Sequence, residues 1–351
     1  MTAVYELLKI AVEQNASDLH ITVGVPPVLK IGAEFRRLGD KPLTPNATAK
    51  LVRELFPKET LYQEFQSEHD KDFSFSVPGL SRFRVNAFKQ RGSLAAVVRI
   101  VPFRLPNPDE LGIPQAVQKL RSLTNGLVLV TGPAGSGKST TLAAIVNLIN
   151  ENRECHILTL EDPIEYLHTH KRSIVNQREI GVDAQNYARA LRAAMREAPD
   201  VILLGEMRDL ETTSIALTAA ETGQLVFSTL HTIGAAKTID RVIDVFPPNQ
   251  QHQVRVQLST VLQAVVSQQL IPSAEKGCVP AFEILRANDA VRNLIRENKT
   301  PLISSIIQTS RSDGMATMDN SLISLFENGL ITKQDALLYS VDKKALAKHI
   351  A

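Results

Sequence analysis

The sequence predicts an α/β protein in two domains, a smaller α+β domain followed by a larger one built on a parallel sheet. Within the first hundred residues apolar side chains alternate with period two, which is typical of a half-buried antiparallel sheet. From residue 124 onward, short unbroken apolar runs alternate with helix-like stretches, as in a parallel sheet covered on both faces. A proline-dense segment separates the two patterns.

The first domain is predicted to span residues 1–101. A helix is expected near its start, then a strand, then a hairpin that turns near Gly32. Thr44 followed by Pro45 is a favourable helix start, because threonine caps the free amides and proline suits the first helical position. The expected helices cover residues 4–14 and 44–55, and the expected strands cover 17–23, the 30–38 hairpin, 72–77, 82–88 and 95–101.

Residues 102–114 are predicted to be a linker, because proline removes amide donors and blocks regular structure. The segment contains Pro102, Pro106, Pro108 and Pro114. The second domain is then expected over residues 115–351. Its strands are predicted at 126–130, 156–160, 201–205 and 225–229, and the part from about residue 250 is predicted to be entirely helical.

Composition excludes several classes of protein. The chain has 351 residues, of which 44% are hydrophobic and 22% charged, so a globular protein of about two domains is expected. A net charge of +2 argues against a nucleic-acid partner bound through bulk charge. The longest apolar runs are far shorter than the roughly 20 residues that a transmembrane segment needs. Two cysteines fit a reducing cytosol and cannot form a four-cysteine zinc site.

Residues 132–140, GPAGSGKST, match the phosphate-binding loop pattern between a predicted strand and a predicted helix. The glycines let backbone amides turn toward phosphate oxygens, and the helix N-terminus favours negative charge. Lys138 would contact the β- and γ-phosphates, and the Ser139 hydroxyl would contact Mg²⁺. The alternative is a glycine-rich turn without a ligand. The residues expected to bind ATP are Gly132, Pro133, Ala134, Gly135, Ser136, Gly137, Lys138, Ser139 and Thr140.

Acidic residues follow two of the predicted strands, where site residues gather in a parallel sheet. Glu165 comes shortly after the strand at 156–160, and Glu206 directly follows the strand at 201–205. The usual metal-side aspartate position is occupied by Gly205, so the pattern is atypical. Both glutamates are candidates for the ATPase site, and the alternative is that they are capping or surface acids.

Four further residues are candidate site residues. His231 follows a strand and is expected to sense the nucleotide or to contact a neighbouring subunit; a structural histidine is the alternative. Arg82, Arg84 and Arg99 lie in the first domain. Arginines stabilise transition-state charge in phosphoryl transfer and are often supplied by another subunit, although edge-strand arginines are commonly only solvated.

These segments together resemble the secretion-ATPase superfamily, and within it the subfamily that retracts type IV pili. The likeness covers nearly the whole chain. It is carried by ASDLHITVGVPPVLKI (16–31), ILTLEDPIEYLH (157–168), APDVILLGEMRD (198–209), TGQLVFSTLHT (222–232), AVRNLIRE (290–297) and GMATMDNSL (314–322). Gln224 departs from the family pattern, which usually has the first histidine of its His box there.

The resemblance implies a hexameric motor with a PAS-like first domain and a RecA-like ATPase domain, which couples Mg-ATP hydrolysis to pilus retraction and twitching motility. It implies that Glu165 activates water, that Glu206 holds Mg²⁺ through bound waters, and that His231 is the second His-box histidine. Arg82, Arg84 and Arg99 would act across a subunit interface. The implied location is cytoplasmic, at the inner face of the cytoplasmic membrane. The implied partners are a membrane platform protein and a paralogous retraction ATPase.

Three other functions stay open at this stage. An assembly or secretion ATPase of the same superfamily would act in the opposite direction, but such relatives usually carry a four-cysteine zinc insert. A RecA-like nucleic-acid motor is disfavoured by the balanced charge and by the absence of tryptophan. A nucleotide switch without turnover is disfavoured by Lys138, Glu165 and Glu206.

The segment 290–297 has the spacing of an amphipathic helix. Val291, Leu294 and Ile295 would share one side, and Arg292 and Arg296 would be more exposed. The helix is either a packing element or, as the resemblance implies, a part that converts hydrolysis into retraction.

Overall fold

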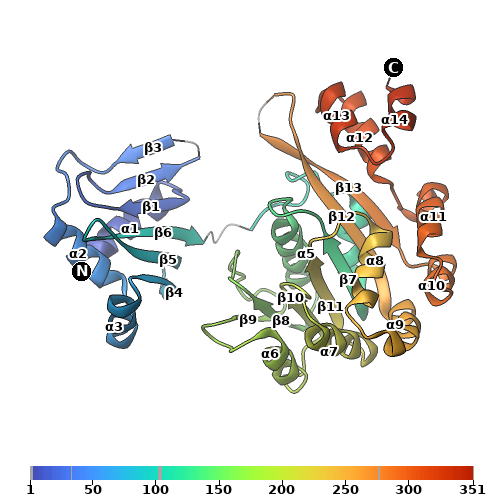
Figure 1. Cartoon of the computed structure of the whole chain (residues 1–351), viewed down its shortest axis with the longest axis horizontal. Coiled ribbons are helices and arrows are strands. Elements are labelled where there is room, and N and C mark those ends of the chain that lie inside the picture. Colours follow the sequence, from blue (N-terminus) through green and yellow to red (C-terminus); the bar gives the residue numbers. More distant parts are fainter. Residues whose placement is uncertain (1–2, 33, 102–104, 276, 351) are drawn as a thin grey trace. The chain divides into compact units, whose positions relative to one another are not determined.

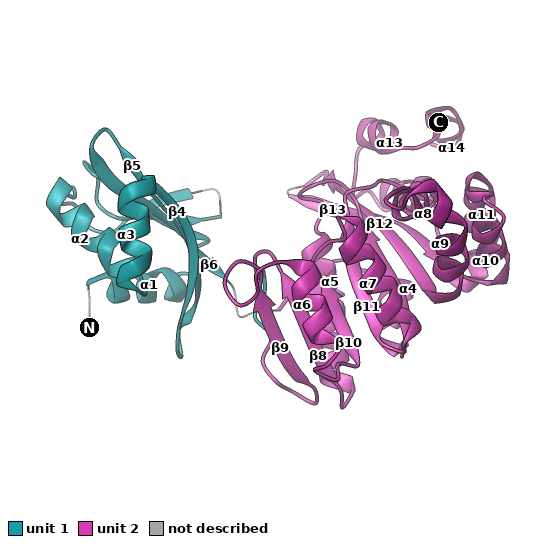
Figure 2. Ribbon diagram, turned by 60° about the horizontal axis from the view of Figure 1, so that its bottom comes forward, with its two compact units in different colours: residues 1–104, 165–167 teal, residues 105–164, 168–351 magenta. Residues whose placement is uncertain are grey.

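The computed structural model describes residues 3–32, 34–101, 105–275 and 277–350. The chain divides into two compact units (Figures 1 and 2). Unit 1 comprises residues 1–104 and 165–167, and unit 2 comprises residues 105–164 and 168–351. Each unit has its own hydrophobic core.

Unit 1 is an antiparallel sheet with helices packed on one face (Figure 1). The strand order is β3-β2-β1-β6-β5-β4. Every predicted strand and helix of this part is present, including the hairpin that turns at Gly32 and the helix capped by Thr44. A third helix, α3, was not predicted. The elements are α1 (Ala3–Glu13), β1 (Asp18–Ile21), β2 (Val28–Ile31), β3 (Glu34–Arg37), α2 (Pro45–Leu55), α3 (Glu59–Glu68), β4 (Asp70–Val77), β5 (Ser81–Gln90) and β6 (Ser93–Val101).

Alternation in β5 separates the core of unit 1 from a polar face. Phe83, Val85 and Ala87 are buried, whereas Arg82 and Arg84 point to the other side and are half-buried. Arg84 lies directly opposite Arg99 of β6, so the predicted arginines share the face away from the core.

Unit 2 contains a seven-stranded sheet in the order β13-β12-β7-β11-β10-β8-β9, parallel except for β13 at one edge. Buried clusters lie on both of its faces, as the unbroken apolar runs predict. The strands are β7 (Gly126–Thr131), β8 (His156–Glu161), β9 (Ile174–Glu179), β10 (Val201–Leu204), β11 (Leu225–Leu230), β12 (Leu262–Pro272) and β13 (Cys278–Arg286).

The helices of unit 2 flank this sheet and continue into a C-terminal helical region (Figure 2). They are α4 (Gln115–Gln118), α5 (Lys138–Asn152), α6 (Tyr187–Ala194), α7 (Leu210–Glu221), α8 (Ala235–Asp244), α9 (Pro248–Val261), α10 (Asp289–Arg296), α11 (Ile303–Thr309), α12 (Met318–Glu327), α13 (Lys333–Tyr339) and α14 (Lys343–His349).

The prediction that the chain is entirely helical from about residue 250 is wrong. The long strands β12 and β13 lie in that part, and β12 pairs in parallel with β7 inside the sheet. Most of β12 is buried on both faces, so its residues show no period-two alternation. A strand without this alternation cannot be distinguished from a buried helix by periodicity alone.

Arg292 is more exposed than the apolar side of its helix, as predicted, but it is half-buried and its guanidinium is hydrogen-bonded. Val291 and Ile295 of α10 are fully buried, as predicted. Arg292, however, donates hydrogen bonds from Nη1 to the carbonyl oxygens of Ser259 and Thr260, the latter at 2.7 Å. These carbonyls belong to the last turn of α9, so Arg292 caps that helix, a contact that helical spacing within one segment cannot reveal.

The proline-dense segment is only partly described, since residues 102–104 lie outside the described residues. Residues 105–114 contain hydrogen-bonded turns, such as that between the Ile113 amide and the Pro108 carbonyl at 2.9 Å. Ile113 itself is buried in the core of unit 2. The assignment of residues 102–114 as a linker between a PAS-like and a RecA-like domain therefore stays a proposal.

Candidate active site

The phosphate loop joins the end of β7 to the start of α5. Gly132 has φ of 144°, and a Cβ atom there would lie 2.1 Å from the backbone oxygen of Gln268. The loop therefore passes so close to β12 that only glycine fits at this position. Gly135 and Gly137 also have positive φ, which lets the backbone curl as an anion-binding loop requires.

Lys138 is held over this loop. It is the first residue of α5 and only 8% exposed. Its Nζ donates to the carbonyl oxygens of Gly132 at 2.9 Å and Pro133 at 2.8 Å. Burial lowers the pKa of Lys138, while the Glu206 carboxylate acts to raise it. The lysine therefore lies within electrostatic reach of Glu206.

Serine hydroxyls complete the loop. Ser136 Oγ is buried and has no hydrogen-bond partner among the described residues. Ser139 lies in the first turn of α5 and is exposed, and Thr140 beside it is half-buried. A buried hydroxyl without a partner is costly unless a ligand supplies one, so this site fits a phosphate-bearing ligand.

Glu206 and His231 meet at the same edge of the sheet as the phosphate loop. Strand β11 lies between β7 and β10, so the residue that follows it lies between the two neighbouring strand ends. His231 Nε2 is 3.6 Å from Glu206 Oε2, and Arg208 forms an ion pair with Glu206 Oε1. Glu206 is buried, whereas the His231 side chain is about half exposed. The expected grouping of Lys138, Glu206 and His231 therefore arises from parallel strand ends.

The structure explains why the acid is at position 206 rather than 205. A Cβ atom on Gly205 would lie 2.6 Å from the Tyr187 hydroxyl and 3.3 Å from the Leu160 carbonyl oxygen. A side chain at this position would have to displace the Tyr187 hydroxyl, which favours glycine. Burial and nearby carboxylates raise the pKa of Tyr187, so its hydroxyl stays protonated beside the site.

A cavity of about 390 Å³ opens beside Glu206 and His231. Arg208 and Arg241 line it and give it two cations that were not among the predicted site residues. Their signal in the sequence is weak, because single arginines in a helix or after a strand are common on surfaces.

Glu165 lies on the segment after β8, and its side chain is exposed. The preceding residue, Ile164, is buried and donates its amide to Glu179 Oε2 at 3.1 Å. Glu179, at the end of β9, thus holds the backbone next to Glu165. The role of Glu165 as the base stays a proposal.

Among the predicted arginines, Arg99 and Arg84 differ. Arg99 Nε donates to Asp18 Oδ1 at 3.0 Å. The two side chains form an ion pair in which the Asp18 carboxylate is only 7% exposed. Arg84 makes no ion pair with any residue that the structure describes. Arg82 Nη1 donates to Ser76 on β4 at 3.2 Å. All three belong to unit 1, whereas the phosphate loop belongs to unit 2.

Gln224 does not lie with His231. It precedes β11 at the amino end of the strand, and its Oε1 accepts a hydrogen bond from Thr222 Oγ1 at 2.8 Å. Because amino and carboxyl ends of parallel strands lie at opposite edges of the sheet, Gln224 is remote from the phosphate loop.

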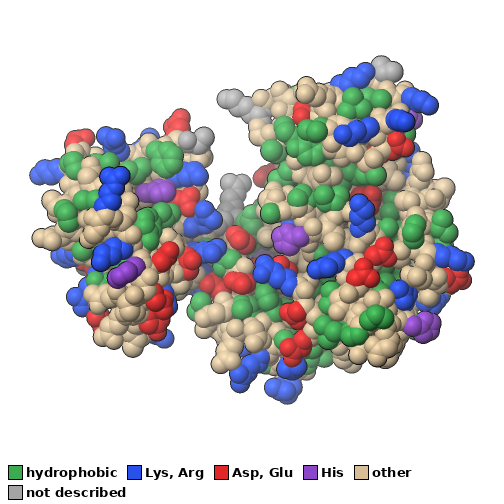
Figure 3. Space-filling view, in the orientation of Figure 1, with side chains coloured by type: hydrophobic (Ala, Val, Ile, Leu, Met, Phe, Trp, Pro, Cys, Tyr) green, Lys and Arg blue, Asp and Glu red, His purple; other side chains and the backbone are tan. Residues whose placement is uncertain are grey.

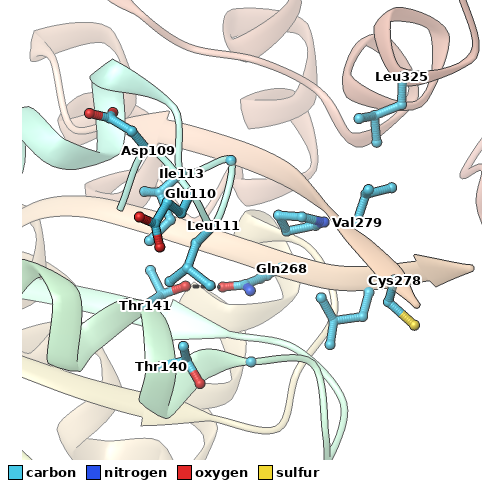
Figure 4. A pocket seen from close by; sticks show the side chains of 14 residues that line it. Asp109, Glu110, Leu111, Ile113, Thr140, Thr141, Gln268, Cys278, Val279 and Leu325 are labelled. Atoms are coloured by element: carbon cyan, nitrogen blue, oxygen red, sulfur yellow. Dashed lines mark hydrogen bonds between the residues drawn. The ribbon is translucent and has the colours of Figure 1, made fainter. Parts of the chain in front are cut away.

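A second cavity, about 480 Å³, adjoins the other side of the phosphate loop (Figure 4). Gly137, Thr140 and Thr141 form part of its wall, and Leu111 and Val279 contribute apolar surface. Thr141 Oγ1 donates to Gln268 Oε1 at 2.8 Å, which ties α5 to β12 (Figure 4). Gln268 was not predicted; in the sequence it stands between Ser267 and Gln269, and no motif marks it.

Comparisons with known proteins agree with this geometry. The sequence profile of the type II/IV secretion system protein family matches residues 2–320. The chain is 48% identical to the type IV pilus retraction ATPase PilT of Pseudomonas aeruginosa, over 94% of this chain and 96% of the relative. It is 47% identical to a twitching motility protein of Neisseria gonorrhoeae, over 95% of this chain and 89% of the relative. A crystal structure of the pilus retraction motor PilT with bound ADP superposes with a TM-score of 0.90 at 49% identity, covering 99% of both chains.

Proposed function

The chain belongs to the type II/IV secretion system protein family, and we propose that it is a motor that uses ATP hydrolysis to retract type IV pili. The ATPase assignment is carried by the convergence of Lys138, Glu206 and His231 at one sheet edge, beside a loop with a buried, unpartnered serine hydroxyl. The direction of action is supported by similarity to relatives that are named for pilus retraction and twitching motility.

Within the site, each predicted residue has a distinct task. The loop amides and Lys138 bind the phosphates, and Glu165 accepts the proton of the attacking water. The Ser139 hydroxyl and the Glu206 carboxylate are hard oxygen donors, which fit Mg²⁺. When bound, Mg²⁺ neutralises phosphate charge. His231, next to Glu206, orients that carboxylate and responds to the state of the nucleotide.

The adenosine part is assigned to the 480 Å³ cavity, because that cavity shares Gly137 and Thr140 with the phosphate loop. Its walls are mainly apolar with a few polar groups, as is usual for cofactor sites. Thr141 and Gln268 fix the position of α5 relative to the wall of this cavity.

The working assembly is a homohexamer in which Arg82, Arg84 and Arg99 complete the site of a neighbouring subunit. A head-to-tail interface that closes on itself gives a ring. The ring acts on an inner-membrane platform protein, at the inner face of the cytoplasmic membrane, together with a paralogous retraction ATPase. Among the described helices, none has the length and apolar content that a membrane crossing requires.

Charge on the viewed surface argues against a nucleic-acid substrate. Acidic and basic side chains are interspersed on the face that Figure 3 shows, rather than gathered by sign. A nucleic-acid motor needs a cationic groove along the phosphate backbone.

The function is tested by imaging pili in a strain from which the protein has been deleted. Retraction predicts an excess of pili that extend and never shorten, and restored shortening when the wild-type protein is returned. Missing pili would instead identify an assembly ATPase.

A further inference from the structure

Glu283, on β13, lies between the segment that carries His231 and the C-terminal helices. Its Oε1 accepts a hydrogen bond at 2.7 Å from the amide of Ala235, the first residue of α8. Met318, the first residue of α12, lines the same two cavities as Glu283, and its backbone amide acts to lower the pKa of that carboxyl. The carboxylate therefore accepts from the first turn of α8 and lies beside the first turn of α12, and negative charge is favourable at both helix N-termini.

The strand opposite adds a second contact to the same segment. Ser267 of β12 pairs directly with Glu283 across the two strands. Its Oγ accepts a hydrogen bond from the Gly234 amide at 3.0 Å, beside the Ala235 amide that Glu283 binds. Gly234 has no side chain with which to cap α8. The turn from His231 into α8 is thus held by a cross-strand pair from β12 and β13.

Strand β12 also touches the phosphate loop. Gln268 follows Ser267 and faces the other side of the sheet, where it binds Thr141 and packs against Gly132. Two consecutive residues of β12 therefore contact different parts of the site. Gln268 contacts the phosphate-loop side, and Ser267 contacts the segment that follows His231.

The surroundings of Glu283 link it to α12. Helix α12 packs on β13 (Figure 1). Cavities of about 400 and 220 Å³ both reach Glu283 and Met318, so the first turn of α12 has open space beside it. Burial raises the pKa of Glu283 and the nearby Asp319 carboxylate adds to this, while the backbone amides of Ala235 and Met318 act in the opposite direction.

We propose that Glu283 is a positioning residue that holds His231 against Glu206 by way of Ala235 and transmits movement of this segment to α12. The proposal rests on the proposed function, since it takes His231 to be part of the ATPase site. One carboxylate is hydrogen-bonded to the first residue of α8 and lies beside the first residue of α12, so a shift of α8 changes the charge that faces α12.

The first test is Glu283→Gln, which keeps the shape but replaces one acceptor oxygen by an NH₂ group that cannot accept from a backbone amide. We expect kcat for ATP to fall on the order of 10- to 100-fold through misplacement of His231, with KM and ADP affinity unchanged. The matched control, Glu327→Gln at the exposed far end of α12, should keep wild-type kinetics. A loss of ADP affinity equal to the loss in kcat would overturn the proposal.

A double-mutant cycle separates positioning from general destabilisation. In a His231→Ala background, Glu283→Gln should cause no further loss in kcat. The proposal would be overturned if Glu283→Gln lowered kcat in the His231→Ala background by the same factor as in the wild type. It would also be overturned if His231→Ala alone kept the wild-type kcat. If Glu283→Gln does not fold, Ser267→Ala takes its place, because it removes only the contact to Gly234; unchanged kcat in that variant would count against the proposal.

The link to α12 is read by amide hydrogen exchange with ADP as the probe. In the wild type, ADP should alter exchange in the first turns of both α8 and α12. In Glu283→Gln the response should persist in α8 and vanish in α12, and an equal α12 response in both proteins would overturn the link. This measurement needs only binding, so a wild type without ATP turnover would contradict the proposed function and leave the link testable.

Discussion

Lys138 is the one cationic side chain within the phosphate loop at 132–140, and its ammonium is bound to loop carbonyl oxygens. We predict that Lys138→Ala abolishes ATP hydrolysis and most ATP affinity. Burial lowers the pKa of this lysine, and bound phosphate would restore the preference for the charged form. Calorimetric titration with ATP and a phosphate-release assay measure the two effects. Lys333→Ala, an exposed lysine in α13, is the control, and wild-type turnover in Lys138→Ala would refute the site.

Substitutions of Glu165 and Glu206 should affect different steps of the ATPase reaction. Glu165→Gln keeps the side-chain shape and removes the base, so Mg-ATP binding should persist while kcat falls roughly 10²- to 10⁴-fold. Glu206→Gln should instead raise the Mg²⁺ concentration needed for half-maximal activity. Magnesium titrations of both variants measure this, and the opposite pattern would reverse the assigned roles.

At the scale of elements, β5 and β6 present arginines on the face of unit 1 away from its core. Arg84→Ala should lose ATPase activity without loss of stability, because Arg84 has no ion-pair partner among the described residues. Arg99→Ala should also lower the free energy of unfolding by about 1 kcal/mol, because the buried Asp18 loses its partner. Urea denaturation and steady-state kinetics distinguish the two.

Mixing inactive subunits tests whether these arginines act across an interface. Equal amounts of Lys138→Ala and Arg84→Ala subunits should recover part of the activity, since some interfaces then pair an intact loop with an intact arginine. If the mixture exchanges subunits but recovers no ATPase activity, Arg84 acts in the site of its own subunit.

Helix α10 carries two arginines with different expected roles: Arg292 stabilises the fold, and Arg296 is exposed. Arg292→Ala should lower the free energy of unfolding by about 1–3 kcal/mol, because it leaves the last carbonyls of α9 without a charged donor. Arg296 is exposed, so Arg296→Ala should leave stability and ATP turnover unchanged while abolishing twitching. Thermal melts, ATPase assays and colony spreading give the three readouts. Normal twitching in Arg296→Ala would reduce α10 to a packing helix.

At the scale of the whole molecule, a site completed by another subunit makes activity depend on assembly. The ATPase rate per subunit should rise with protein concentration and level off as the hexamer forms. Sedimentation velocity in parallel with kinetics checks the correspondence. A monomer with full activity at all concentrations would exclude an interfacial site.

The sequence by itself determined the parts that depend on local order. The phosphate loop follows from glycine, lysine and serine in register between a strand and a helix, and Lys138 hydrogen-bonds to carbonyl oxygens of that same loop. The sheet of unit 1 follows from alternation, because one of its faces is buried and the other is not. Glu206 and His231 could be expected together, since parallel strands end at one edge.

Only the tertiary structure decided the rest, because those features arise from contacts between distant segments. Strand β12 is buried on both faces and so lacks the alternation that identifies a strand. Tyr187 crowds Gly205, Arg292 caps α9, and Glu283 accepts a hydrogen bond from the first turn of α8 beside the first turn of α12. In each of these contacts the partner lies far away in the chain. The local sequence around a residue does not indicate which distant group will contact it after folding.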